Sequence, residues 1–355
     1  MNGFSHLSLL IDLDSEQWWP EPAALTATTT YFPKRSRRLL HESLHYWQQL
    51  SQGYLFLLAE EDWTDFVACE ATSRAPAEGP RRRHFRQSEG RHGFSAWNVS
   101  ESLTQFWEIF LIGRDEATSP MLEVASEIAA PQRWISDDDL DAAMLASRDY
   151  SEPFRLARRV IDPAFSLIIF PFLAHFALKT SRPAHFFERF IDEVAAPAGA
   201  KASEMSVLDP DSEAGPGVLY PEIKQLCDEL IRREGEAGLL HAPDLFRASL
   251  LRENPPYAWS FRRLARLASR VRGSGELDTA ICLPSLREHR KILAHELTPP
   301  CLRFADGVPL ALAHRYLAQT QDAAAEDLSA AKDAAVACFA LQARSDELRQ
   351  AARGY

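Results

Sequence analysis

The sequence has no excess of basic residues. Of its 355 residues, 39 are Lys or Arg and 50 are Asp or Glu, which gives a formal net charge of −11 at pH 7. An acidic chain repels the phosphate backbone of nucleic acids, so we expect no general nucleic-acid binding. Hydrophobic residues make up 46% of the chain and charged residues 25%, as in ordinary globular proteins. This composition excludes a chain that is disordered throughout.

Cysteine is scarce, and no apolar run is long. The five cysteines are scattered and form no C-x-x-C pair, a pattern typical of reduced cytosolic thiols. The first residues lack the basic region and the cleavage site of a signal peptide. The most apolar stretch, residues 163–178, is interrupted by Pro171 and His175 and is shorter than the roughly 20 residues that span a membrane. We therefore expect a cytoplasmic protein without a membrane segment, and a buried core helix at this stretch.

The chain is predicted to be mainly α-helical with a few short strands. Apolar residues recur at helical spacing through most of it, for example at Leu44, Trp47, Leu55 and Leu58. A short strand is expected at 7–13 and an extended segment at 298–308. Helices are expected at 35–61, 99–112, 120–130, 137–148, 152–160, 164–179, 183–194, 221–238, 242–253 and 257–273, with one or two more at 309–352.

Two stretches favour loops over helices. Residues 74–93 are rich in Arg, Gly and Pro and contain almost no apolar residues, which predicts a mobile loop. Residues 195–219 are rich in Ala, Gly, Pro and acidic residues, which predicts a linker or long surface loop. Such a linker would separate a metal-site helical domain, residues 1–194, from a C-terminal helical region, residues 220–355. The two regions can still pack as one unit.

The pattern H-E-S-L-H at residues 41–45 carries the clearest chemical signal. It is an H-E-x-x-H motif inside a predicted helix, where residues four apart share a face, so the two imidazoles can bind one metal ion. Glu42 lies about 100° further round the helix and can act as general base on a water molecule. The motif therefore predicts a metal site with a neighbouring base.

A ribbon of polar side chains runs beside the apolar stripe of the same predicted helix: His41, His45, Gln48 and Gln52. Polar groups next to a buried face cost free energy unless they are paired. A metal ion and its supporting hydrogen bonds would pair them. The alternative is a surface His-Glu-His triplet that binds no metal.

At these residues the sequence resembles the zincin metallopeptidases. The metzincin extension is absent, because Gln48 and Ser51 stand where its Gly and its third His would be. This leaves the gluzincin-like arrangement, in which a Glu on a later helix is the third ligand. The segment HESLHYWQ is also similar to uncharacterised bacterial proteins with H-E-x-x-H-Y/F-x-Q helices. The resemblance implies a multi-helix zincin-like architecture, with Zn²⁺ held by His41, His45 and a later Glu.

Glu101 is the predicted third ligand. It shares with Gln105 and Glu108 one face of the helix expected at 99–112. Gluzincins often carry an acid four residues after the ligand Glu, where it orients a His; Gln105 stands there and can still accept a His N–H. Asn98-x-x-Glu101 is also a capping box, which leaves open a purely structural role for Glu101. Glu108 and Glu70 are rival ligands.

Other residues carry weaker signals. The basic cluster at residues 81–86 is either a solvated loop or an electrostatic rim for an acidic substrate or a phosphate. The remaining candidates are His84 and His92 as loop ligands, His175 and His185 as core histidines beside a helix break, and His295 and Tyr220 as donors to an oxyanion.

Two classes of function fit these observations. The first is a zinc-dependent hydrolase, most simply a peptidase acting on a peptide or protein substrate. Zn²⁺ would lower the pKa of a water molecule, and Glu42 would take its proton and pass it to the leaving amine. The second is a non-catalytic interaction or regulatory protein with a structural metal or none, which the Ala-rich C-terminal helices fit. Proximity of Glu101 to both His residues would favour the hydrolase.

Overall fold

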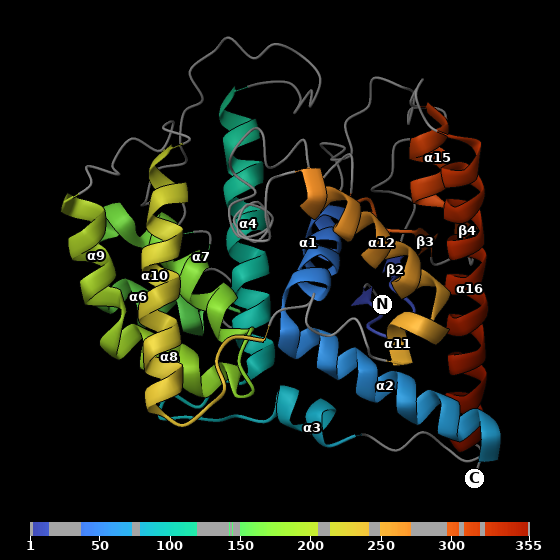
Figure 1. Cartoon of the computed structure of the whole chain (residues 1–355), viewed down its shortest axis with the longest axis horizontal. Coiled ribbons are helices and arrows are strands. Elements are labelled where there is room, and N and C mark those ends of the chain that lie inside the picture. Colours follow the sequence, from blue (N-terminus) through green and yellow to red (C-terminus); the bar gives the residue numbers. More distant parts are fainter. Residues whose placement is uncertain are drawn as a thin grey trace.

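The computed structural model describes residues 3–13, 37–72, 79–118, 142, 144, 150–204, 214–240, 249–270, 297–304, 309–319 and 324–353. In these residues the protein is mainly α-helical with a few short strands, as the sequence predicts (Figure 1). The helix expected at 120–130, and that at 137–148 apart from positions 142 and 144, lie outside the described residues.

The elements in chain order are β1 (Gly3–Phe4), β2 (Leu10–Leu13), α1 (Arg37–Ser51), α2 (Gly53–Thr72), α3 (Pro80–Arg86), α4 (Ala96–Thr118), α6 (Glu152–Val160), α7 (Pro163–Ala177), α8 (Pro183–Glu193), α9 (Ala195–Glu204), α10 (Ala214–Arg233), α11 (Ser249–Glu253), α12 (Pro255–Arg270), β3 (Cys301–Phe304), β4 (Pro309–Leu310), α15 (Leu312–Gln319) and α16 (Ala325–Arg353).

Helix α4 stands between two groups of elements (Figure 1). On one side it contacts α6, α7 and α8, against which α9 and α10 pack. On the other side it contacts α1, which in turn contacts α2, α12 and β2, while α16 packs on α12 and α15. The interface between α1 and α4 is therefore the place where the two groups meet.

A small sheet joins the two ends of the chain. Its strand order is β1-β2-β3-β4. Strands β2 and β3 pair in parallel, with Leu10 opposite Cys301, and the other two pairs are antiparallel. The strand expected at 7–13 begins only at Leu10, since residues 6–8 form a turn between β1 and β2. The described part of the extended segment expected at 298–308 contains β3.

One large hydrophobic cluster runs through both groups, from Leu7 to Leu348. The apolar stretch expected as a buried helix is α7, where residues 169–177 are completely buried. Four cysteines are free and buried, as expected of core thiols: Cys69, Cys227, Cys301 and Cys338. The cluster crosses the predicted domain boundary, and the division of the chain into domains stays a prediction. None of the described helices is long and apolar enough to cross a membrane.

The helix expected at 35–61 is broken. It ends at Ser51, and α2 begins at Gly53 and runs on to Thr72. The Tyr54 backbone N–H bonds to the Leu178 carbonyl oxygen, 3.1 Å away. A Cβ at Gly53 would lie 2.3 Å from the Leu240 Cβ, so only glycine allows this approach. The expectation was wrong because distant chain segments cause the break.

The loop expected at 74–93 contains a helix, α3, in its described part. Pro80 stands in the first turn, where its missing N–H costs nothing. The Glu61 carboxylate accepts hydrogen bonds from the backbone N–H groups of Arg81 and Arg82, and Phe85 is buried. These contacts come from α2, so the composition of the segment did not predict them.

The prediction of a linker or surface loop at 195–219 is wrong for most of this range. Residues 195–204 form α9, and α10 begins at Ala214; residues 205–213 lie outside the described part. Small side chains explain α9, because Ala195, Ala198 and Ala202 are buried on its packed face. Alanine is both a strong helix former and small enough for close packing.

Candidate metal centre

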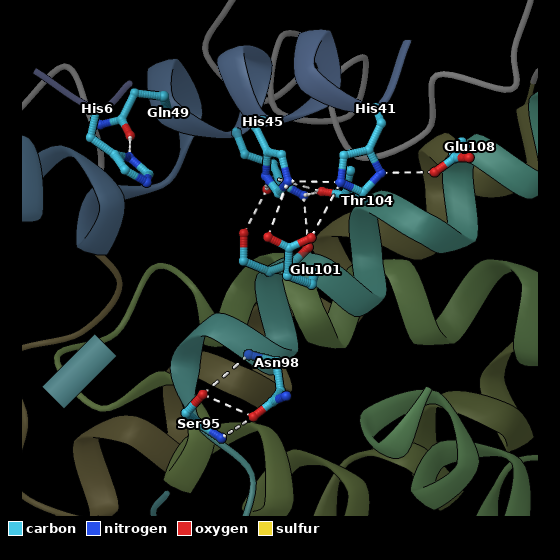
Figure 2. A network of polar contacts seen from close by, with 11 residues as sticks. His6, His41, His45, Gln49, Ser95, Asn98, Glu101, Thr104 and Glu108 are labelled. Atoms are coloured by element: carbon cyan, nitrogen blue, oxygen red, sulfur yellow. Dashed lines mark hydrogen bonds and ion pairs between the residues drawn. The ribbon is translucent and has the colours of Figure 1, made fainter. Parts of the chain in front are cut away.

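Helix α1 carries His41 and His45 on the side that faces α4 (Figure 2). Two hydrogen bonds anchor the helix to the later chain. Trp47 Nε1 donates to the Leu297 carbonyl oxygen at 3.0 Å, and the Tyr46 hydroxyl donates to Ser260 Oγ at 3.0 Å. These buried contacts fix the rotation of α1 and turn the two imidazoles toward α4.

Helix α4 begins at Ala96, and Ser95 caps it. Ser95 Oγ accepts the Asn98 backbone N–H, while Asn98 Oδ1 accepts the Ser95 backbone N–H at 2.8 Å, a reciprocal capping box. The capping box predicted between Asn98 and Glu101 therefore does not form, because the helix starts earlier than predicted. It also ends later, running past Gly113 to Thr118. Glu101 takes no part in the cap, and its carboxylate lies under the two imidazoles (Figure 2).

His41, His45 and Glu101 converge on one point. His41 Nε2 lies 3.2 Å from His45 Nε2 and 3.2 Å from Glu101 Oε2. His45 Nε2 lies 3.4 Å from Glu101 Oε1. Ligand atoms about 2.0–2.2 Å from a tetrahedral zinc ion are about 3.3–3.6 Å apart. The three residues therefore lie close enough to hold one metal ion.

His41 is oriented by Glu108, whose Oε2 lies 2.8 Å from Nδ1. A carboxylate on the far nitrogen is the usual support of a metal-binding His. Burial favours the neutral imidazole, but hydrogen bonds to Glu101 and Glu108 outweigh it and raise the pKa of His41 to about 10. The role expected of Gln105 is wrong: its Oε1 is buried and meets no hydrogen-bond donor among the described residues. One further turn of α4 brings Glu108 to His41 instead.

His45 is oriented by neutral groups. Gln48 Oε1 lies 3.3 Å from His45 Nδ1 and also accepts a hydrogen bond from Ser100 Oγ at 2.8 Å. Gln48 Nε2 donates to Thr104 Oγ1 at 2.9 Å. Because the amide oxygen faces the ring, Nδ1 of His45 is the donor in this contact, and Nε2 faces Glu101. The expected support by Gln48 is thus present, whereas Gln52 contacts His175 instead.

The acidic groups of the site differ in pKa. Burial raises the pKa of Glu42 above its usual range, even though the charges of His45 and His41 oppose this. Burial acts in the same direction on Glu101, but the positive charge of His45 and hydrogen bonds to both imidazoles hold the pKa of Glu101 well below its usual range. Glu101 is therefore the ionised group that can bind a cation, and Glu42 is the more basic carboxylate.

The rival ligands lie outside this group. Glu70, near the end of α2, pairs with Arg344 of α16, with 2.5 Å between Oε1 and Nε. Glu108 contacts His41 through Nδ1, on the far side of the ring from Nε2. Of the three carboxylates considered from the sequence, Glu101 is the one that contacts both imidazoles at Nε2.

The weaker candidates have other surroundings. Arg82 pairs with Asp62, whereas His84, His92 and the other arginines of the 81–86 cluster are exposed. His175 is fully buried, as expected of a core histidine. His185 differs, since it is partly exposed and bonds to Glu234. Tyr220 is buried among Phe172 and Phe176, and His295 lies outside the described residues.

The sequence analysis missed one polar pair beside the centre. His6 Nδ1 lies 2.5 Å from Gln49 Oε1, and Gln49 stands four residues after His45, on the same face of α1. That spacing extends the motif by one more turn and was the signal that could have identified Gln49. Nothing in the sequence places His6 there.

Comparisons with protein families, with curated proteins and with solved structures found no match for this chain.

Proposed function

We propose that this protein is a zinc-dependent hydrolase that cleaves peptide bonds, with a gluzincin-like site. One observation carries the proposal: His41 Nε2, His45 Nε2 and the Glu101 carboxylate converge at distances of 3.2–3.4 Å. A second supports it, because Glu42 is buried and carries a raised pKa beside this group.

His41, His45 and Glu101 would hold the ion. Two imidazole nitrogens and one carboxylate are the donors of many catalytic zinc sites. A zinc ion bound there supplies Lewis-acid chemistry, which polarises a carbonyl group and makes water more acidic. With an ion bound, Glu108 and Gln48 would accept hydrogen bonds from Nδ1 of the two imidazoles and so leave Nε2 of each to the ion.

Glu42 is the proposed general base. Catalysis by a carboxylate is most efficient when its pKa approaches the working pH, and burial shifts the pKa of Glu42 in that direction. The carboxylate accepts a proton from the attacking water and later gives it to the leaving amine.

The alternative is a non-catalytic interaction or regulatory protein with a structural metal. Structural zinc sites usually have four protein ligands, whereas catalytic sites have three and an open position. The described residues contribute three. Three protein ligands are the number that the hydrolase needs.

The test measures metal and activity together. Protein purified without added metal should contain about one zinc per chain and should cleave a quenched-fluorescence peptide library. Glu42→Gln should keep its zinc while the cleavage rate falls by about 10²–10⁴-fold. Glu70→Gln is the matched control, because Glu70 pairs with Arg344 away from the centre, and it should change neither quantity. Absence of zinc in the parent, or equal zinc loss in Glu42→Gln, would contradict the proposal.

A further inference from the structure

The turn between β1 and β2 is held firmly by the second half of the chain. Its three backbone carbonyls each accept a hydrogen bond: that of His6 from the Tyr257 hydroxyl, that of Leu7 from Asn254 Nδ2 and that of Ser8 from Cys338 Sγ. Leu9 follows with a φ of 59°, a left-handed conformation that is unfavourable for leucine. Strained backbone of this kind persists only where surrounding contacts enforce it, and it concentrates at functional sites.

This turn places His6 against α1, near the candidate metal centre. The ring packs edge-on against Phe4 and Phe85, and its Nδ1 contacts Gln49, one helical turn beyond His45 on α1. In Figure 2 the His6 ring lies below α1, on the same side as the His45 ring. The side chain is only partly buried, so part of it can be reached from outside the protein.

The hydrogen bonds of Gln49 determine the tautomer of His6. Gln49 Nε2 donates to the Leu55 carbonyl oxygen at 2.7 Å, and a carbonyl can only accept. The amide oxygen must then face His6, so Nδ1 of His6 carries the proton and Nε2 is an acceptor. Burial, helped by the charge of Arg82, lowers the pKa of His6 to about 3, which keeps the ring neutral at physiological pH. A neutral ring with this tautomer cannot donate to an oxyanion.

We propose that Nε2 of His6 accepts a hydrogen bond from a main-chain N–H of a polypeptide substrate bound at the centre. This inference rests on the proposed function and adds a substrate-binding residue to it. No described residue hydrogen-bonds to Nε2 of His6, whereas its Nδ1 contacts Gln49 and its backbone carbonyl accepts a hydrogen bond from Tyr257. Peptides offer N–H donors on their main chain, which is the group that such an acceptor binds.

The experiment compares two substitutions of His6, of which only one keeps an acceptor near the position of Nε2. His6→Asn keeps a donor for Gln49 in the place of Nδ1 and removes the acceptor. His6→Gln places an amide oxygen near the position of Nε2. Zinc-loaded proteins are titrated calorimetrically with acetohydroxamate, which has no peptide amide, and with the tightest-binding member of a defined pool of N-acetyl dipeptide hydroxamates. That member is also prepared with each amide N-methylated in turn.

His6→Asn should weaken binding of the dipeptide hydroxamate by about three- to tenfold, as expected for one neutral hydrogen bond, and leave acetohydroxamate binding unchanged. His6→Gln should recover part of the loss. N-methylation of one amide should weaken binding to the parent by a similar factor and have little further effect in His6→Asn. Unchanged dipeptide binding in His6→Asn, or equal weakening for both hydroxamates, would overturn the role of His6 alone. A parent protein that binds neither zinc nor any hydroxamate would overturn the proposed function itself.

Discussion

Substitution of Glu101 by Gln should remove most of the stabilisation that a metal ion gives. A ligand at a thousandfold excess over its Kd stabilises the folded state by about 4 kcal/mol. A chain of 355 residues has an unfolding entropy of roughly 0.75 kcal/mol/K at about 2.1 cal/mol/K per residue. A chelator should therefore lower the Tm of the zinc-loaded parent by about 5 °C.

The loss expected for Glu101→Gln follows from the geometry. Glu101 contacts both imidazoles at Nε2, so a neutral amide in its place removes one of three converging donors. Loss of a residue that only hydrogen-bonds to a metal ligand weakens metal binding by up to about 100-fold. Loss of a ligand itself should weaken metal binding by at least this factor. It corresponds to about 2.7 kcal/mol, so the chelator effect should shrink to about 2 °C or less.

Ser95→Ala is the matched control on the same helix. Ser95 caps α4 through its hydrogen bonds with Asn98, and loss of such a cap costs about 1 kcal/mol. Its Tm should be lower with and without chelator, and the difference between the two should stay near 5 °C by the same estimate. The assay is thermal unfolding followed by circular dichroism at equal zinc excess. A chelator effect in Glu101→Gln as large as in the parent would refute the role of Glu101 as a ligand.

Two further predictions concern His41 and its partner Glu108. Glu108→Gln should weaken zinc binding by about 10- to 100-fold, measured by competition with a chromophoric chelator, because His41 loses the carboxylate on Nδ1; unchanged affinity would contradict this support. In chelator-treated protein, the pKa of His41 is raised from 6.5 to about 10, so its stabilising contribution is present below pH 6.5 and is lost as the pH rises toward 10. The free energy of unfolding in urea should accordingly fall more steeply between pH 7 and pH 10 in the parent than in His41→Gln; parallel curves would show that His41 does not titrate there.

The helical class and three residues of the candidate centre could be predicted from the sequence, because both depend on the local spacing of residues. His41 and His45 lie four residues apart, and Glu101 shares a face with Glu108. These intervals specify which side chains project together whatever the rest of the chain does. The convergence of the three on one point confirms the expected proximity of Glu101.

The remaining features depend on contacts between distant segments. The break between α1 and α2 before Gly53 follows from the approach of Leu178 and Leu240, and no local sequence pattern predicts it. The choice of Glu108 rather than Gln105 as the partner of His41 depends on how far α4 is rotated against α1. The position of His6 requires the pairing of β1 with β2 and the hydrogen bonds from the turn to α12 and α16.

The candidate ligands come from two helices that are supported independently of each other. Helix α1 is tied to the later chain by Trp47 and Tyr46. Helix α4 is packed on the opposite group, where Phe106 lies against Phe154 and Phe170. The distance between the imidazoles and the Glu101 carboxylate is thus determined by how the two groups of helices pack against each other. A change in that packing would alter the distances between the three candidate ligands without changing any of them. Because a binding site must be held to within about 0.5 Å of its working geometry, a substitution at the α1–α4 interface should weaken metal binding.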